Sequence, residues 1–351
     1  MSHGFKRHSH TFSYDRLILA LGSITNFYNL PGLAQRALTM KSLGDAVELR
    51  NRLIAHLEEA DTDCARDHRE PLLTFVVVGG GFAGVETIAA VNDFLRQVLP
   101  LYRSLNERML RLILVHGGAA ILPELGPELG RYAQKKLAER GIEIIVNNRV
   151  AAASEDCVTL TDGMKIQSST IIWTAGTTPN PILGDMPCTK DHGRVVVNDY
   201  LQLPDWPRVW AIGDCAVLLD RHTGRPYPPT AQHALRQGRV AAQNVVAAIR
   251  GRPAKKFSFR TLGQMAAIGR RAGVADILGI RFSGFVAWWL WRTVYLSKLP
   301  GWDRKVRVAL QWTLDVLCSK DVTQYLTVRA PVISREDVED LLPAGRGPVG
   351  D

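Results

Sequence analysis

Residues 72–90, LLTFVVVGGGFAGVETIAA, predict a strand, a glycine turn and a helix in direct succession. An apolar, β-branched run at Thr74–Val78 leads straight into the glycines. Gly79, Gly81 and Gly84 form a G-x-G-x-x-G pattern, which indicates a dinucleotide site when a strand precedes it and a helix follows. Gly79 allows the tight turn, Gly81 lets the backbone approach a pyrophosphate, and Gly84 lets the helix pack closely on the strand. The alternative interpretation is a glycine-rich turn within the core.

The sequence after this turn continues as alternating strands and helices. A strand at Arg111–Val115 follows the helix, and the alternation runs on to an apolar strand at Thr170–Trp173, so residues 72–176 predict a parallel α/β domain. At the end of the second strand of such a domain, an acidic residue holds the ribose 2′-hydroxyl of NAD, or an Arg nearby accommodates a 2′-phosphate. The sequence has neither at that point. His116 stands there instead, and it either bonds a ribose or caps the strand.

Two further strands, predicted over 14–21 and 208–212, end on small or acidic residues. These residues are Gly22 and Ser23 after the first strand, and Gly213 and Asp214 after the second. The carboxyl ends of parallel strands are where such sheets bind ligands, although a plain loop and a helix N-cap are the alternatives. Gln232 and His233 open a helix predicted over 231–249 and are also placed to face a ligand, but a lone histidine there is more often structural.

The composition is that of an ordinary globular protein, and 351 residues suffice for roughly two domains. The five cysteines are widely spaced and form no C-x-x-C pair, so the sequence predicts no metal site, disulfide framework or dithiol centre. The net charge of +9 is uneven, because residues 250–310 hold thirteen Lys or Arg and two acidic residues. A basic region on a near-neutral body predicts an anionic partner, either a membrane surface or a nucleic acid.

The same basic region is rich in tryptophan. Its apolar stretch 282–296 contains Arg292 and is shorter than the ~20 apolar residues that a membrane-spanning helix needs. Tryptophans and cations on amphipathic helices are typical of the lipid interface, so we expect Trp288, Trp289 and Trp291, with nearby Lys and Arg, to contact a membrane surface. An oligomer interface is the alternative. Nucleic acid is not expected as a partner, because no reader motif is present.

Taken together, these residues resemble the type II NADH dehydrogenases, single-subunit FAD enzymes among the flavoproteins with two dinucleotide-binding domains. Six pieces carry the resemblance, in the order of the family: LILALGS (17–23), VVVGGGFAGVE (76–86), WTAG (173–176), WAIGDCA (210–216), AQHA (231–234) and FSGFVAWWLWR (282–292). The resemblance covers about residues 14–331. The cysteine pairs of disulfide reductases and sulfide:quinone reductases are absent, which separates the chain from those relatives.

The resemblance implies an FAD-dependent NADH:quinone oxidoreductase. NADH is expected on the 79–84 turn, with hydride passing to FAD and electrons passing on to a membrane quinone. The implied catalytic residues are Gln232, beside the flavin and the quinone, and Glu86, near the nicotinamide and the flavin. The expected cofactor-binding residues are Gly22, Ser23, Gly79, Gly81, Gly84, Glu86, His116, Gly176, Gly213, Asp214 and Gln232, with Asp214 bonding the ribityl chain of FAD.

The expected fold is α/β, with two Rossmann-like dinucleotide-binding domains and a C-terminal amphipathic helical region that anchors the chain to a membrane. The family carries another G-x-G-x-x-G for FAD ahead of the LILALGS strand, and nothing in residues 1–13 resembles it. We therefore expect the FAD-binding domain to be incomplete at its N-terminus. The expected segments are 1–71 and 181–260 for the FAD-binding domain, 72–180 for the inserted NAD(P)H-binding domain, 261–331 for the membrane-associating region and 332–351 for a disordered tail.

Two other functions stay open from the sequence. One is a non-catalytic remnant that binds NADH and membranes but not FAD, and the other is a related flavoprotein with a different electron acceptor. The expected location is peripheral, on the cytoplasmic face of the inner (plasma) membrane. Formation of a homodimer also stays open.

Overall fold

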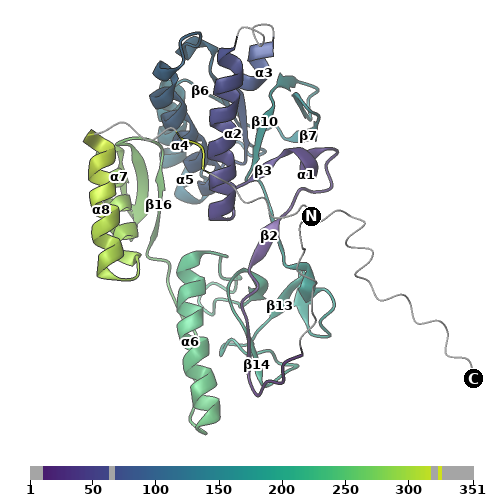
Figure 1. Ribbon diagram of the computed structural model, residues 1–351. Coiled ribbons are helices and arrows are strands. Elements are labelled where there is room, and N and C mark those ends of the chain that lie inside the picture. The colour runs from purple at the N-terminus through teal and green to yellow at the C-terminus, as the bar shows by residue number, and fades with distance from the viewer. Residues whose placement is uncertain (1–10, 63–67, 318–322, 326–351) are drawn as a thin grey trace, which may run out of the picture.

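The computed structural model describes residues 11–62, 68–317 and 323–325. Two α/β domains are connected by an antiparallel pair of short strands, β2 (Ser23–Thr25) and β11 (Thr177–Pro179). Figure 1 shows β2 between the two domains and the C-terminal helices beside the upper one. We call residues 26–176 the larger domain, residues 11–22 with 180–260 the smaller domain, and residues 261–317 the C-terminal unit.

The larger domain is built on a parallel five-stranded sheet with the order β3-β10-β4-β5-β6. Its strands are β3 (Leu38–Thr39), β4 (Thr74–Val78), β5 (Arg111–Val115), β6 (Ile142–Ile145) and β10 (Thr170–Trp173). In the central strand β4, Phe75 and Val77 enter the core on one face of the sheet, whereas Val76 and Val78 enter the core on the other. Burial on both faces is the physical reason for the continuous apolar run that predicts this strand.

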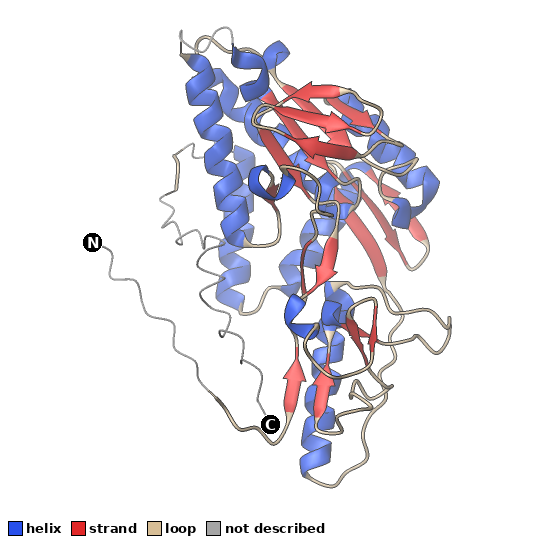
Figure 2. Cartoon of the chain, turned by 90° about the vertical axis from the view of Figure 1, so that its right-hand side faces the viewer, coloured by secondary structure: helices blue, strands red, loops and turns tan. Residues whose placement is uncertain are grey.

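The two faces of this sheet are covered by different elements. On one face lie α2 (Leu43–Asp61), α4 (Phe82–Val98) and α5 (Gly126–Glu139). On the other lies an antiparallel sheet of β7 (Val150–Ala153), β8 (Cys157–Leu160) and β9 (Lys165–Gln167), which Figure 2 shows in front of the large sheet. Short helices complete the domain, α1 (Leu33–Arg36) and α3 (Arg69–Leu73). The parallel α/β domain predicted from residue 72 onward is confirmed.

Helix α2 belongs to the larger domain. It begins with a capping box, because Ser42 Oγ accepts the N–H of Asp45 while the Asp45 carboxylate accepts the N–H of Ser42. Its buried leucines, in the same core as Phe75 of β4, are Leu49, Leu53 and Leu57. Strand β3 adds to the same sheet ahead of α2. This packing corrects the domain boundary expected at residue 72, since the chain enters the larger domain well before it.

The smaller domain contains the second pair of predicted strands. β1 (Leu17–Leu19) pairs in parallel with β14 (Val209–Ala211), and a second sheet joins β12 (Lys190–Asp191), β13 (Arg194–Val196) and β15 (Ala216–Val217). Helix α6 (Ala231–Ile249) contributes the buried Ala241 to a core that also contains Trp210 of β14. Within the part of the chain that the structure describes, β1 has no strand on its other edge. The sheet expected to bind FAD thus has two strands here.

The C-terminal unit differs from the helical region expected over 261–331, because it begins with an antiparallel sheet. Its strands are β16 (Gly263–Ala267), β17 (Gly273–Ile277) and β18 (Ile280–Ser283). Ala266 and Val274 of this sheet are buried in the core shared with α4. Small residues with weak alternation conceal these strands in the sequence, since they fit close packing between elements rather than a clear apolar stripe.

Two helices follow this sheet, α7 (Gly284–Lys298) and α8 (Trp302–Leu317). α7 approaches β17 closely at Gly273, where a Cβ atom would lie 2.8 Å from the backbone nitrogen of Trp288. None of the helices among the described residues combines the length and the apolar character needed to cross a membrane. The tail expected over 332–351 lies outside the described residues.

Candidate functional site

The glycine turn after β4 has the geometry that its sequence predicts. Gly79 has φ +116°, a backbone conformation that favours glycine, and its N–H donates to the carbonyl of Val115 at 2.8 Å. A Cβ on Gly84 would lie 1.7 Å from the carbonyl oxygen of Gly79, so α4 packs against the turn only because this position lacks a side chain. A Cβ on Gly81 would meet no atom of a described residue within 4 Å, because Gly81 borders an open pocket at the start of α4.

This pocket has a volume of about 1030 Å³ and lies at the carboxyl ends of the parallel strands. Three loops line it, those that follow β4, β5 and β10, and we call it the glycine-turn pocket. The residues that they contribute are Gly79–Gly81, His116–Gly118 and Thr174–Gly176, joined by Tyr28, Asn148, Arg149 and Glu124. The structure thus brings Gly79, Gly81, His116 and Gly176 of the predicted site together. A cavity of this size at the strand ends of an α/β sheet is suited to a nucleotide cofactor.

His116 supports the glycine turn itself. Its Nδ1 atom accepts the N–H of Gly80 at 3.1 Å, and burial lowers the pKa of the imidazole below its ordinary value. The ring is therefore neutral at neutral pH, with the lone pair of Nδ1 committed to the turn. A Cβ on Gly80 would lie 2.6 Å from the His116 ring, so this histidine and this glycine fit each other closely. His116 therefore braces the turn from the end of β5, and its contact with a ribose stays a prediction.

Gly176 is also explained by close packing. A Cβ there would lie 2.6 Å from the hydroxyl of Tyr28, whose ring also meets Trp173 edge-on at 6.4 Å between centroids. Tyr28 lines the glycine-turn pocket from the segment that enters the larger domain. The sequence motifs contained no signal for this tyrosine, because its place beside Gly176 depends on the pairing of β2 with β11.

In the smaller domain, the two predicted strand ends do meet. Ser23 Oγ donates to Asp214 Oδ2 at 2.8 Å, although the residues are 191 positions apart in the chain. Lys41 Nζ donates to Ser23 Oγ at 2.9 Å, and the buried Gln237 accepts the N–H of Gly213 through Oε1 at 2.7 Å. The parallel pairing of β1 with β14 produces this convergence. Lys41 and Gln237 are site residues that the motifs did not reveal.

The glycines of these strand ends have left-handed backbone conformations, with φ +63° at Gly22 and φ +71° at Gly213. Among the described residues, no atom lies within 4 Å of a Cβ built on Gly22, so the end of β1 is open to a ligand. A hydroxyl that is hydrogen-bonded to both an ammonium group and a carboxylate suits the polyhydroxy part of a cofactor such as the ribityl chain of FAD. The structure therefore fits a ligand at this edge of the smaller domain.

Gln232 and His233 stand at the start of α6 with different roles. Gln232 Nε2 donates to the carbonyl of Gly263 at 2.8 Å and so ties α6 to the first residue of β16. His233 is buried, with its ring 5.3 Å from that of Tyr227 and 5.1 Å from that of Phe259, and burial lowers its pKa. This burial among aromatic rings fits a structural residue. Gln232 joins the smaller domain to the C-terminal unit.

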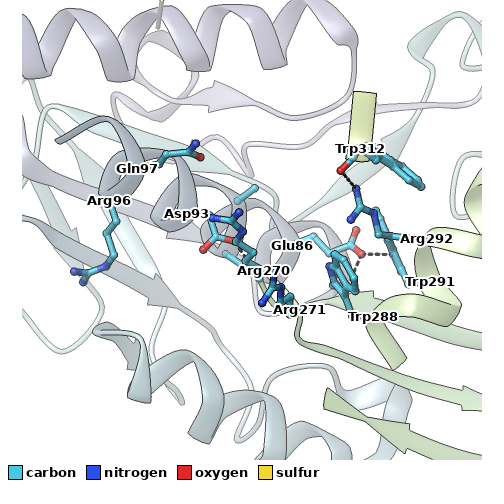
Figure 3. A pocket seen from close by; sticks show the side chains of 14 residues that line it. Glu86, Asp93, Arg96, Gln97, Arg270, Arg271, Trp288, Trp291, Arg292 and Trp312 are labelled. Carbon is cyan, nitrogen blue, oxygen red and sulfur yellow. Dashed lines mark hydrogen bonds between the residues drawn. The ribbon is translucent and has the colours of Figure 1, made fainter. Parts of the chain in front are cut away.

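Glu86 faces a second pocket, which Figure 3 shows, and not the glycine-turn pocket. This Glu86 pocket has a volume of about 550 Å³ and lies where α4, the β16–β17 turn, α7 and α8 meet. Glu86 Oε1 accepts the N–H of Ala267 at 3.0 Å and the indole N–H of Trp291 at 2.9 Å. Burial raises the pKa of the Glu86 carboxyl. Glu86 and the glycines of the turn thus line different pockets, and the place of Glu86 near the nicotinamide and the flavin stays a prediction.

The tryptophans of α7 divide between an inner and an outer face. Trp291 bonds Glu86 and stacks on Trp312 of α8, with 6.5 Å between ring centroids. The guanidinium of Arg292 lies 4.5 Å from the ring of Trp288 and 4.5 Å from that of Trp312. Trp288 and Trp291 are half-buried, whereas Trp289 is 54% exposed. The rings of Trp291 and Trp288 are thus engaged within the protein, whereas Trp289 is exposed, and contact of these tryptophans with a membrane stays a prediction.

Comparison with known proteins gives two matching families. A family described as pyridine nucleotide-disulphide oxidoreductase matches residues 3–238, and one described as NDH2 C-terminal domain matches residues 262–321. The type II NADH:quinone oxidoreductase Ndh of Mycobacterium tuberculosis is 31% identical over 326 residues, which span 89% of this chain and 69% of that protein. The demethylphylloquinone reductase NdbB of Synechocystis is 33% identical over 307 residues, which span 86% of this chain and 70% of that protein.

Solved structures show the same fold. The structure of NDH2 from Plasmodium falciparum in complex with NADH superposes with a TM-score of 0.81 at 19% identity, covering 89% of this chain and 80% of that one. Reduced Bacillus anthracis CoADR-RHD gives a TM-score of 0.57 at 25% identity, covering 75% of this chain and 42% of that one. The sequence matches run through both domains and the C-terminal unit.

Proposed function

Because the chain belongs to the pyridine nucleotide-disulphide oxidoreductases and, among them, to the type II NADH:quinone oxidoreductases, we propose that it oxidises NADH and reduces a membrane quinone through bound FAD. FAD and NADH are the cofactors of this family, and its members are oxidoreductases. The observation that carries the proposal is the open pocket at Gly81, where β4, the glycine turn and the start of α4 meet.

The chain's own residues account for binding of the dinucleotide. Gly81 is the N-cap of α4, so the unpaired N–H groups of the first turn and the helix dipole favour a pyrophosphate there. Gly79 and Gly84 keep the turn close enough to the helix for that approach. His116 fixes the turn by accepting the N–H of Gly80. These groups of the glycine turn hold the phosphates of NADH. Gly176 lines the same pocket.

The residues at the ends of β1 and β14 are proposed to hold FAD. Ser23, Lys41 and Asp214 offer a hydroxyl, an ammonium group and a carboxylate for its polar chain, and Gln237 fixes the backbone of Gly213 beneath them. When bound, FAD supplies the capacity to accept hydride from NADH and to pass electrons to a quinone. Gln232 stands between the smaller domain and the C-terminal unit, and we assign it to positioning the acceptor side of the site.

Glu86 is proposed to supply protons for reduction of the quinone. Its carboxyl is buried, its pKa is raised, and it lies in a pocket that aromatic side chains of α7 and α8 share. Formation of a quinol takes up protons, and a carboxyl whose pKa is moved toward neutral pH is suited to deliver them. The indole of Trp291 and the N–H of Ala267 hold one oxygen of this carboxyl in place.

The outer face of α7 and α8 is proposed to bind the membrane surface. Its exposed apolar side chains are Phe285, Val286, Trp289, Trp302, Val306, Leu310 and Leu314. Nearby cations, including Lys298 and Lys305, suit anionic lipid headgroups. Trp302, 80% exposed, joins Trp289 as a proposed membrane-facing residue. The chain would then be peripheral, on the cytoplasmic face of the inner membrane.

The test is a Gly81→Val substitution in the full-length chain. A valine there projects into the space for the pyrophosphate, so titration calorimetry should detect no NADH binding, and NADH-dependent quinone reduction should be lost. Gly44→Val is the matched control, because Gly44 lies in the exposed first turn of α2, where a Cβ would meet only Ser42 Oγ at 3.4 Å. Unchanged NADH affinity in Gly81→Val would contradict the assignment. A wild-type protein that binds NADH but retains no flavin would contradict the FAD part alone.

A further inference from the structure

The strand end at which dinucleotide-binding sheets distinguish NADH from NADPH borders the glycine-turn pocket. In dinucleotide-binding α/β sheets, the ribose 2′ position is recognised at the end of the second strand. A carboxylate there bonds the 2′-hydroxyl of NAD, and an arginine nearby accommodates the 2′-phosphate of NADP. Here that strand is β5, which pairs with β4 and ends at Val115. The loop that follows, His116–Gly118, contains no carboxylate. It lines the pocket together with Gly79 and Gly81.

The fold brings an arginine to this loop from a distant part of the chain. The N–H of Asn147 donates to the carbonyl of Gly118 at 2.9 Å, and the N–H of Asn148 donates to the carbonyl of His116 at 3.2 Å. These two backbone hydrogen bonds join the segment after β6 to the loop after β5. Arg149 is the next residue, and its own N–H is held by Asn148 Oδ1 at 2.9 Å. Its backbone position beside the loop is therefore fixed by main-chain bonds.

The Arg149 side chain lies directly over Gly117. A Cβ built on Gly117 would be 2.7 Å from Arg149 Nε and 3.0 Å from its Cγ. The guanidinium makes no hydrogen bond or ion pair with any other residue in the described ranges. Glu124, which also lines the pocket, forms no ion pair with it. The pocket thus presents an exposed guanidinium beside the loop that follows β5.

We propose that Arg149 is a specificity residue that binds a ribose 2′-phosphate, so that this chain takes NADPH as a substrate in addition to NADH. The guanidinium donates two parallel hydrogen bonds to phosphate oxygens, an arrangement that Lys cannot reproduce. Gly117 is required at its position because any side chain would displace Arg149. The inference rests on the proposed function, since it assumes that the glycine turn binds a nicotinamide dinucleotide.

The experiment compares two adenine probes on the full-length protein by titration calorimetry. Adenosine 2′,5′-bisphosphate carries the phosphate in question, and adenosine 5′-monophosphate lacks it. A charge-assisted hydrogen bond corresponds to roughly 10- to 100-fold in affinity, so the bisphosphate should bind at least about tenfold more tightly. Arg149→Gln should remove this difference and leave binding of the monophosphate unchanged. Arg252→Gln, an equal loss of charge beyond the end of α6, should retain the difference.

Turnover gives a second readout. The ratio of kcat/KM for NADPH to that for NADH should fall at least about tenfold in Arg149→Gln, mainly through KM for NADPH. Equal affinity of the wild-type protein for the two adenine probes would overturn the inference, and so would an Arg149→Gln variant that keeps the difference. Both of those results leave the proposed function intact. Failure of the wild-type protein to bind either probe or NADH would overturn the proposed function, and this inference with it.

Discussion

Lowering the pH should destabilise the larger domain through one buried histidine of α2. His56 is 8% exposed, and its Nδ1 atom lies 3.0 Å from the Thr170 hydroxyl of β10. Burial, with a smaller contribution from the positive charge of Arg52, lowers the pKa of His56 from 6.5 to about 4. The unfolded chain therefore binds a proton below pH 6.5 that the folded chain does not. Stability should fall as the pH drops from the unfolded value toward the folded one.

The size of this effect follows from the two pKa values. Between about pH 7.5 and about pH 5, an unfolded pKa of 6.5 and a folded pKa of about 4 predict a loss of about 2 kcal/mol in the free energy of unfolding. This is a large part of the stability of an ordinary domain. The nearby Asp156 carboxylate acts in the opposite direction, but burial is the dominant cause.

The assay is urea denaturation at both pH values for three proteins, the wild type, His56→Gln and His222→Gln. His222 is exposed and serves as the matched control. The loss of free energy between the two pH values should be about 2 kcal/mol smaller in His56→Gln than in the wild type, whatever the absolute stability of the variant. His222→Gln should behave as the wild type. Identical losses in the wild type and His56→Gln would refute the reasoning.

Three further predictions concern the pockets and the C-terminal helices. Gly84→Ala should lower the free energy of unfolding by about 1–3 kcal/mol and weaken NADH binding, because the new methyl group meets the backbone oxygen of Gly79. Thermal unfolding and titration calorimetry measure the two effects, and a variant as stable as the wild type would contradict the prediction. Trp291→Phe removes a hydrogen bond that lowers the pKa of Glu86, so the pH profile of quinone reduction should move to higher pH. An unchanged pH profile would argue against Glu86 as a proton donor. Trp289→Ser should lower the fraction of protein that sediments with anionic vesicles, whereas Trp291→Phe should leave this fraction unchanged. An equal decrease in both variants would count against the outer face of α7 as the membrane contact.

The sequence by itself determined the local elements of this protein. The run at Thr74–Val78 is a strand because each of its side chains is buried, and the glycine after it turns because only glycine readily adopts its backbone angle. Ser42 and Asp45 begin α2 through a capping box that spans four residues. These features depend on side-chain periodicity and turn chemistry over a few positions, so they are legible without the rest of the chain.

The tertiary structure decided which of these elements meet. Ser23 reaches Asp214, and Glu86 reaches Trp291 across 205 positions, through strand pairing and helix packing that no local pattern encodes. The expected absence of an arginine at the end of β5 came from considering neighbours in sequence only. Arg149 lies over Gly117 because two backbone hydrogen bonds join the loops after β5 and β6. The register and order of the strands set such contacts, and these are properties of the whole sheet.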